Sequence, residues 1–454
     1  MKRGVVTPAH KKDEKVKKEN YRPICTLPPL SKVFERILCN QINLFMNDKL
    51  SHKLCGFRKG YSTQYALIKL LENWRHHLEN KDVVGVILCD LSKAFDTLPH
   101  DLLIAKLEAY GFGQKSLKLI YDYLNDRKQQ CKVGSAYSTW LDVSTGVPQG
   151  SVLGPLLFNI FINDFFDFIE ESEVCNFADD NTLYSAGKSL DEVICKLEKD
   201  MKKTMIWFEN NSLAANPKKF QLMFLGTNKI VKKCLNINGN ICISKSTVLL
   251  LGVNIDWKLN FNTHVNYICS KASAKVKALH RLRLKLDSKQ KMILYNSFLM
   301  SMFNYCPVVW MFCGKTANER INNIQKRALQ ALYNDFESSF QVLLNRGNHF
   351  TIHEMNKRRL LVEVYKCINK ETPPFLYNIF KPKKVFHNLR IKDTLSLPEA
   401  STKTWGLHSF AYRGSRAWNS LPDNVKHLPS LKEYKNHMKN MDKLQCTCKL
   451  CIVE

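Results

Sequence analysis

The stretch VVGVILCD, residues 83–90, decides the fold because it switches the chain from a helical to an extended pattern. Its apolar, β-branched run predicts a buried central strand, and Asp90 follows at the carboxyl end of that strand. Further along, residues 174–184 predict a hairpin with Asp179 and Asp180 in its turn. An aspartate in either setting is common, so each one alone is weak support for a catalytic role.

Together, these carboxylates match the requirement of nucleotidyl transfer. In that reaction a 3′-hydroxyl attacks an α-phosphate, and two Mg²⁺ ions with hard oxygen ligands stabilise the attacking and leaving oxygens. Rigid neighbouring strands hold such ligands at fixed positions. We therefore predict that Asp90 and Asp179 hold two Mg²⁺ ions, with Mn²⁺ as an alternative metal, provided that their strands pair.

Helices and strands alternate around these segments, which predicts an α/β chain. Ser31 is the expected N-cap of the first long helix, and Pro155 suits the first turn of a later one. Residues from 264 to about 333 have a helical pattern, whereas the last hundred residues follow no clear pattern. Helical spacing of apolar residues predicts helices at 31–50, 63–78, 102–110, 116–124 and 191–210, and a strand pattern marks 221–225.

The charge of the chain indicates a polyanionic partner. It has 454 residues, 45% of them hydrophobic, with 68 Lys and Arg against 41 Asp and Glu, a formal net charge of +27. The excess runs through several segments, which favours nucleic acid binding over an ordinary basic protein. A lysine-rich start, no long apolar run and sixteen scattered cysteines predict a soluble intracellular protein without a membrane partner. Nucleus and cytoplasm both fit, since we find no targeting signal.

Six motifs resemble, in the same order, those of reverse transcriptases of non-LTR (LINE-type) retrotransposons, especially the jockey-like group. The resemblance is collinear from about Lys2 to Asp256 and weaker beyond. The motifs are NYRPI (20–24), GFRKGYST (56–63), LCDLSKAFD (88–96), GVPQGSVLGP (146–155), FADD (177–180) and LLGV (250–253).

The resemblance implies a right-handed fingers–palm–thumb polymerase fold of the α/β (α+β) class with an antiparallel palm sheet. Fingers would occupy residues 1–82 and lack an upstream part, because the chain starts inside that region without an endonuclease domain. The palm would occupy 83–260, with inserted finger helices at about 101–145. A helical thumb would follow at 261–345, and a small C-terminal region of unknown role at 346–454.

The same resemblance assigns roles around the incoming nucleotide. Asp90, Asp179 and Asp180 would be the catalytic metal ligands, with Asp180 the less essential. Phe95 would be a steric gate against the ribose 2′-hydroxyl, although a core aromatic is the alternative. Gln149 and Gly150 would lie along the nucleotide and the template base, where Gly allows close backbone approach.

Other residues would contact phosphates or the primer. Arg58 would contact a triphosphate or template phosphate, or else be a solvated charge. Lys219 would lie beside the departing pyrophosphate, although the adjacent Lys218 leaves this choice open by one position. Leu251 and Gly252 resemble a primer grip, with a bulged buried strand as the alternative.

The thumb and the tail carry further candidates. Basic residues interleaved with Ala and Leu predict a helix face that binds template–primer phosphates, rather than a solvated face of mixed charge. Its candidates are Lys271, Lys275 and Arg281. Cys446, Cys448 and Cys451 depart from the usual zinc spacing, so we assign no metal there.

We therefore predict an RNA-directed DNA polymerase that extends a DNA primer on an RNA template with dNTPs. One alternative is a truncated retroelement relic that binds RNA without catalysis. Another is an RNA-dependent RNA polymerase or a maturase-like protein, which Ala178 and Phe95 disfavour because RNA polymerases of that type commonly carry Gly before the paired aspartates and lack an aromatic gate.

Overall fold

The computed structural model describes residues 2–11, 14–383, 394–402 and 404–441. The chain divides into two compact units. The first unit contains Met1–Lys59, Gly85–Leu222 and Lys232–Ser244, and the second contains Gly60–Val84, Met223–Val231 and Lys245–Glu454. Both helices and sheets are present, so the predicted α/β (α+β) class is confirmed. The domain boundaries that the resemblance implies stay predictions.

A four-stranded sheet with the order β11-β3-β9-β8 carries the candidate site. Its central strand β3 is buried along nearly its whole length, as its apolar run predicts. The hairpin of β8 and β9 is antiparallel, with Phe177 opposite Asp180 at its closed end. The bounds are β3 Val83–Cys89, β8 Glu173–Phe177, β9 Asp180–Gly187 and β11 Gln221–Leu225.

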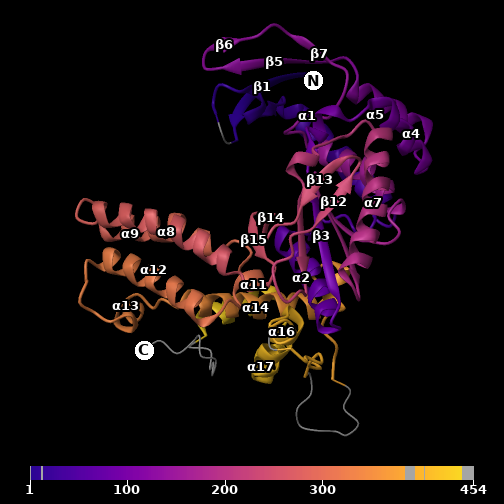
Figure 1. The fold of residues 1–454 in the computed structure, drawn as a ribbon. Coiled ribbons are helices and arrows are strands. Elements are labelled where there is room, and N and C mark those ends of the chain that lie inside the picture. Colours follow the sequence, from indigo (N-terminus) through magenta and orange to yellow (C-terminus); the bar gives the residue numbers. More distant parts are fainter. Residues whose placement is uncertain (1, 12–13, 384–393, 403, 442–454) are drawn as a thin grey trace. The chain divides into compact units, whose positions relative to one another are not determined.

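Another sheet, which lies in the first unit, has the order β2-β1-β5-β6, and β7 also pairs with β5 (Figure 1). β1 runs antiparallel to β2, with Val5 opposite Thr26, and parallel to β5, with Arg3 opposite Lys128. The bounds are β1 Arg3–His10, β2 Tyr21–Thr26, β5 Arg127–Val133, β6 Ala136–Tyr137 and β7 Leu141–Val143. Short strands β4 Leu91–Ser92 and β10 Ala214–Ala215 pair with each other, as do β12 Cys234–Ile237 and β13 Asn240–Ile243.

The helices of the first unit follow their apolar spacing, although several boundaries differ from the prediction; the helix predicted at 31–50 ends at Met46. Ser31 is not the N-cap of α1, because the helix begins at Pro29 and Ser31 is buried inside it. Proline at N1 is already fixed in a helical φ and lacks the N–H that a cap would satisfy. Pro155 lies in the first turn of α6, as predicted. The helices are α1 Pro29–Met46, α3 Ala94–Thr97, α4 His100–Ala109, α5 Gln114–Leu124, α6 Gly154–Ile162 and α7 Leu190–Asn210.

The second unit is mainly helical. Its long helices α8 and α12 pack side by side, and a π-helical turn at Tyr295–Met300 follows α9 (Figure 1). Strands β14 Thr247–Leu250 and β15 Val253–Asp256 form a hairpin. The helices are α2 Thr63–Glu79, α8 Asn262–Leu282, α9 Ser288–Leu294, α10 Ser301–Phe303, α11 Pro307–Trp310, α12 Lys315–Tyr333, α13 Phe340–Arg346, α14 Ile352–Ile368, α15 Pro374–Tyr377, α16 Phe410–Asn419, α17 Asp423–Lys426 and α18 Leu431–Asn440.

Two composition-based expectations can be compared with this fold. Each cysteine in the described ranges carries a free thiol, and most of these thiols are buried, although Cys195 and Cys234 are exposed. Within the same ranges, no helix is both long and apolar enough to cross a membrane. Residues 442–454, which include Cys446, Cys448 and Cys451, lie outside the described residues.

Candidate active site

Asp90 directly follows β3, at the carboxyl end of this buried inner strand. Its backbone carbonyl accepts the N–H of Asn216 at 3.0 Å, next to the β4–β10 pair. Its carboxylate Oδ2 lies 3.4 Å from Nζ of Lys219, and both side chains keep access to solvent, at 34% and 56% exposure. Of the two adjacent lysines, Lys219 is the one that forms this ion pair in the described part of the chain, so the geometry favours Lys219 over Lys218.

Asp179 occupies the turn between β8 and β9, and Asp180 is the first residue of β9. Ala178 adopts a left-handed conformation with φ of 59°. Two fully buried asparagines brace the turn: Nδ2 of Asn176 donates to the carbonyl of Ala178 at 2.7 Å and to Oδ1 of Asn181 at 3.0 Å. Such a network fixes the backbone that carries the two aspartates.

Gly56 supports the same turn from another part of the chain. A Cβ atom built on Gly56 would lie 2.4 Å from the backbone nitrogen of Ala178, a distance that real Cβ atoms do not adopt. Asn159 is buried and donates to the carbonyl of Gly56 at 2.9 Å. The glycine is therefore required because the backbone of the aspartate turn approaches it directly.

β3 and β9 are neighbours in the sheet; Asp90 directly follows β3, and Asp180 is the first residue of β9. The Asp180 side chain retains contact with solvent, but partial desolvation raises its pKa to about 6. The negative charges of Asp179 and Asp90 raise this pKa as well, and the positive charge of Lys11 opposes them. Asp90 and Asp179 are therefore close enough to Asp180 for their charges to act on its carboxyl group.

A carboxyl group whose ionisation is opposed by two neighbouring carboxylates gains from a nearby cation, which fits a divalent metal. The side chains alone do not complete such a site. Among the residues that the structure describes, no three His, Cys, Asp or Glu side chains are gathered closely enough to hold an ion. The roles of Asp90, Asp179 and Asp180 as metal ligands stay predictions.

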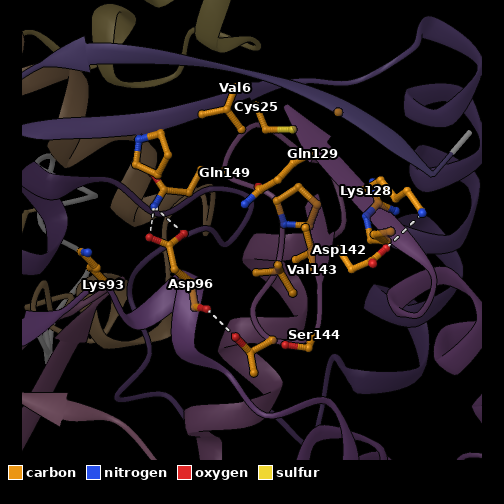
Figure 2. A pocket seen from close by; sticks show the side chains of 16 residues that line it. Val6, Cys25, Lys93, Asp96, Lys128, Gln129, Asp142, Val143, Ser144 and Gln149 are labelled. Carbon is orange, nitrogen blue, oxygen red and sulfur yellow. Dashed lines mark hydrogen bonds and ion pairs between the residues drawn. The ribbon is translucent and has the colours of Figure 1, made fainter. Parts of the chain in front are cut away.

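Phe95 and Gln149 both belong to the first unit, and each is held by a neighbouring side chain. The ring of Phe95, which is half-buried on α3, stacks on Phe158 with centroids 4.5 Å apart and meets Phe57 edge-on at 5.8 Å. Nε2 of Gln149 donates to both carboxylate oxygens of Asp96, at 3.0 and 3.2 Å (Figure 2). Its one amide donor group is thus directed to Asp96.

Gly150 has a φ of 121°, and a Cβ there would lie 2.4 Å from the carbonyl oxygen of Cys25. The N–H of Cys25 donates to the carbonyl of Gln149 at 2.7 Å, so strand β2 is held against this loop. A cavity of about 340 Å³ opens here (Figure 2). Its lining includes Lys93, Asp96, Arg127, Gln129, Thr145 and Gln149.

Arg58 makes local contacts in this structure. Its Nη1 donates to the carbonyl of Ser51 at 2.9 Å, so its predicted phosphate contact would require the guanidinium to use its other donors or to move. That role stays a prediction.

The remaining candidates belong to the second unit. Leu251 and Gly252 form the β14–β15 turn with positive φ, and Tyr305 donates its hydroxyl to the carbonyl of Leu251 at 2.7 Å. On α8, Lys271, Lys275 and Arg281 are exposed. Nζ of Lys275 donates to the carbonyl of Phe298 at 3.0 Å. No structural feature tests their contact with a primer or template.

Residues 9–255, more than half of the chain, match the family described as reverse transcriptase (RNA-dependent DNA polymerase). The chain belongs to the reverse transcriptase family. The match covers all three aspartates and the loop that carries Gln149, so the strand and turn described above lie within the reverse transcriptase region.

The chain is also similar to proteins of non-LTR elements. It is 27% identical to a probable RNA-directed DNA polymerase from transposon BS of Drosophila melanogaster, over 69% of this chain and 36% of that protein. It is 26% identical to the RNA-directed DNA polymerase from mobile element jockey of the same organism, with the same coverage. The chain thus spans little more than a third of the length of these relatives.

Among solved structures, apo telomerase from Candida tropicalis has a TM-score of 0.43 and 12% identity, over 76% of this chain and 59% of that one. So distant a likeness adds nothing to the assignment of this reverse transcriptase.

Sequence reasoning missed several residues of the reverse transcriptase site. Asp96 stands in a quoted motif, but its bond to Gln149 joins residues far apart in the chain and has no local signal. Asn176 and Asn181 are likewise unremarkable in the sequence. Lys11, whose charge acts on Asp180, could have been suspected only from the basic character of its segment.

Proposed function

We propose that this chain is an RNA-directed DNA polymerase that extends a DNA primer on an RNA template with dNTPs. The observation that supports this most directly is the reverse transcriptase match over residues 9–255, combined with Asp90 at the end of β3 and Asp180 at the start of the neighbouring strand β9. The net charge of +27 agrees with a nucleic acid partner.

In this proposal, Asp90, Asp179 and Asp180 hold two Mg²⁺ ions. When bound, Mg²⁺ would stabilise the negative charge on the attacking and leaving oxygens. Lys219, beside Asp90, would hold a positive charge near the departing pyrophosphate. Phe95, fixed by its stack on Phe158, would press against the sugar of the incoming nucleotide.

Gln149 would orient the nucleotide in a specific way. Because Asp96 accepts from Nε2 of Gln149, the amide side chain is held in one orientation. Its Oε1 would then be the atom that accepts a hydrogen bond from the nucleotide. Gly150 lets the loop lie against β2, because a Cβ there would collide with the carbonyl oxygen of Cys25.

The test is primer extension on an RNA template, with dNTPs and rNTPs offered in separate reactions. We expect dNTP incorporation that stops when EDTA removes the metal and returns with added Mg²⁺. Asp179→Ala should lower the rate by at least about a hundredfold to a thousandfold, as losses of charge stabilisation do.

Glu173→Ala is the matched control, since it removes an exposed acid from the same hairpin. Absence of dNTP incorporation by folded wild-type protein would contradict the proposal and leave RNA binding alone. Preferential use of rNTPs would instead indicate an RNA polymerase.

A further inference from the structure

Glu35 is a charged residue that is completely buried, with 0% of its surface exposed, on the inner face of α1. A buried carboxylate is costly unless hydrogen bonds satisfy its oxygens. Oε2 of Glu35 accepts the backbone N–H groups of Val152 at 2.5 Å and Leu153 at 3.2 Å. Oε1 accepts the hydroxyl of Tyr123 at 3.1 Å.

These partners connect Glu35 to the loop that carries Gln149 and Gly150. Val152 and Leu153 follow Gly150 by two and three residues, immediately before α6, and their N–H groups are donors that the helix itself leaves unsatisfied. A carboxylate at this point also interacts favourably with the positive end of the helix dipole. Glu35 therefore holds the downstream end of the loop.

The upstream end of the same loop is held separately. Cys25 donates its N–H to the carbonyl of Gln149 at 2.7 Å, and Asp96 accepts from the side chain of Gln149. Burial raises the pKa of Tyr123, so its hydroxyl stays protonated and remains a donor to Glu35. All of these residues belong to the first unit.

We propose that Glu35 is a positioning residue for nucleotide selection, which fixes the loop of residues 148–153 so that Gln149 and Gly150 meet the incoming nucleotide in one geometry. Glu35 itself does not contact the substrate. This inference rests on the proposed polymerase function, because it assigns the loop a nucleotide to position. Small errors in positioning lower catalytic efficiency strongly even when the residue lies away from the chemistry.

Steady-state primer extension on an RNA template should separate positioning from mere stability. Glu35→Ala should raise KM for dNTPs about tenfold or more, with a smaller change in kcat. Glu35→Gln keeps one carbonyl oxygen for the two N–H groups and should restore part of the loss. Tyr123→Phe, which removes only the third bond, should have a weaker effect in the same direction.

Asp200→Asn is the matched control. Asp200 also has 0% exposure, and its carboxylate accepts the N–H groups of Glu170 at 3.3 Å and Glu171 at 2.9 Å, which do not belong to the nucleotide loop. This variant should lower the melting temperature but leave KM for dNTPs unchanged. A wild-type KM in Glu35→Ala, or an equal rise of KM in Asp200→Asn, would overturn the proposal.

Hydrogen–deuterium exchange provides a readout that does not depend on activity. In Glu35→Ala, the peptide covering residues 148–154 should exchange at least about tenfold faster than in the wild type, whereas Asp200→Asn should not change it. Unchanged exchange would overturn the positioning role. If the wild type incorporates no dNTP, the proposed function fails, while the exchange experiment still decides whether Glu35 holds the loop.

Discussion

At the residue scale, single side chains in this site are held by partners that limit their freedom. Phe95 is stacked against Phe158, so its ring has a defined plane at the candidate nucleotide position. Gln149 is held by Asp96, whose pKa is raised by desolvation although the Gln149 hydrogen bond and Lys93 oppose the shift. Fixed side chains of this kind can discriminate between closely similar substrates.

Phe95→Ala is expected to weaken selection against ribonucleotides, because removing the ring opens space where a 2′-hydroxyl would lie. The preference for dNTPs over rNTPs, measured as the ratio of kcat/KM values, should fall by about tenfold or more. Phe95→Tyr keeps a ring at this position and should retain most of the selectivity. Unchanged sugar discrimination in Phe95→Ala would remove Phe95 from the role of gate.

At the element scale, the hairpin of β8 and β9 depends on a glycine that precedes it by more than a hundred residues. Gly56 approaches the backbone of Ala178 so closely that only a hydrogen fits there. The motif around Gly56 therefore supports the turn that carries Asp179, independently of any contact between Arg58 and phosphate.

Gly56→Ala should displace the aspartate turn. Forcing a methyl group into this contact is expected to destabilise the protein by about 1–3 kcal/mol and to reduce primer extension more than stability alone explains. Thermal melting and extension rates at a temperature where the variant is folded would measure both effects. Gly113→Ala is a suitable control, since a Cβ at Gly113 meets nothing within 4 Å; equal behaviour of the two variants would contradict the interpretation.

Helix α8 contains a histidine whose burial predicts sensitivity to acid. Nδ1 of His264 accepts the N–H of Asn254 at 3.2 Å, and Nε2 is buried without a hydrogen-bond partner in the described part of the chain. Desolvation lowers the pKa of His264 from 6.5 to about 4. The unfolded chain therefore binds a proton at a higher pH than the folded chain does.

The contribution of His264 to the free energy of unfolding should be complete above about pH 6.5. It should decline as the pH falls and reach its minimum below about pH 4. The total loss would be about 3 kcal/mol. His264→Gln, whose amide oxygen can still accept from Asn254, should lose this part of the pH dependence. Denaturant unfolding from pH 4 to 8 would measure it, and identical profiles for wild type and variant would refute the assignment.

At the scale of the whole molecule, the net charge of +27 predicts binding to nucleic acid that weakens steeply with salt. The logarithm of the affinity for an RNA–DNA hybrid should fall linearly with the logarithm of salt concentration. Lys271→Gln and Arg281→Gln should each reduce that slope by about one if these exposed side chains on α8 contact phosphates. Lys370→Gln, an exposed charge after α14, is the control, and equal slopes for all variants would exclude a phosphate contact by α8.

The sequence alone determined the elements that bear the site. The run of residues 83–89 is a buried strand, residues 174–184 form a hairpin, and Asp90, Asp179 and Asp180 end up where those patterns predict. These features are readable because side-chain alternation and turn chemistry are local properties of the backbone. The prediction that Ser31 is the N-cap was wrong for a local reason too, because α1 already begins at Pro29.

Only the tertiary structure decided which elements meet. It made β3 a neighbour of β9, set Gly56 against Ala178, and directed the buried Glu35 to the N–H groups of Val152 and Leu153. Each of these contacts joins residues ninety or more positions apart, and it is fixed by packing and by the need to satisfy buried polar groups. No local pattern encodes such pairings, so they become visible only in the folded chain.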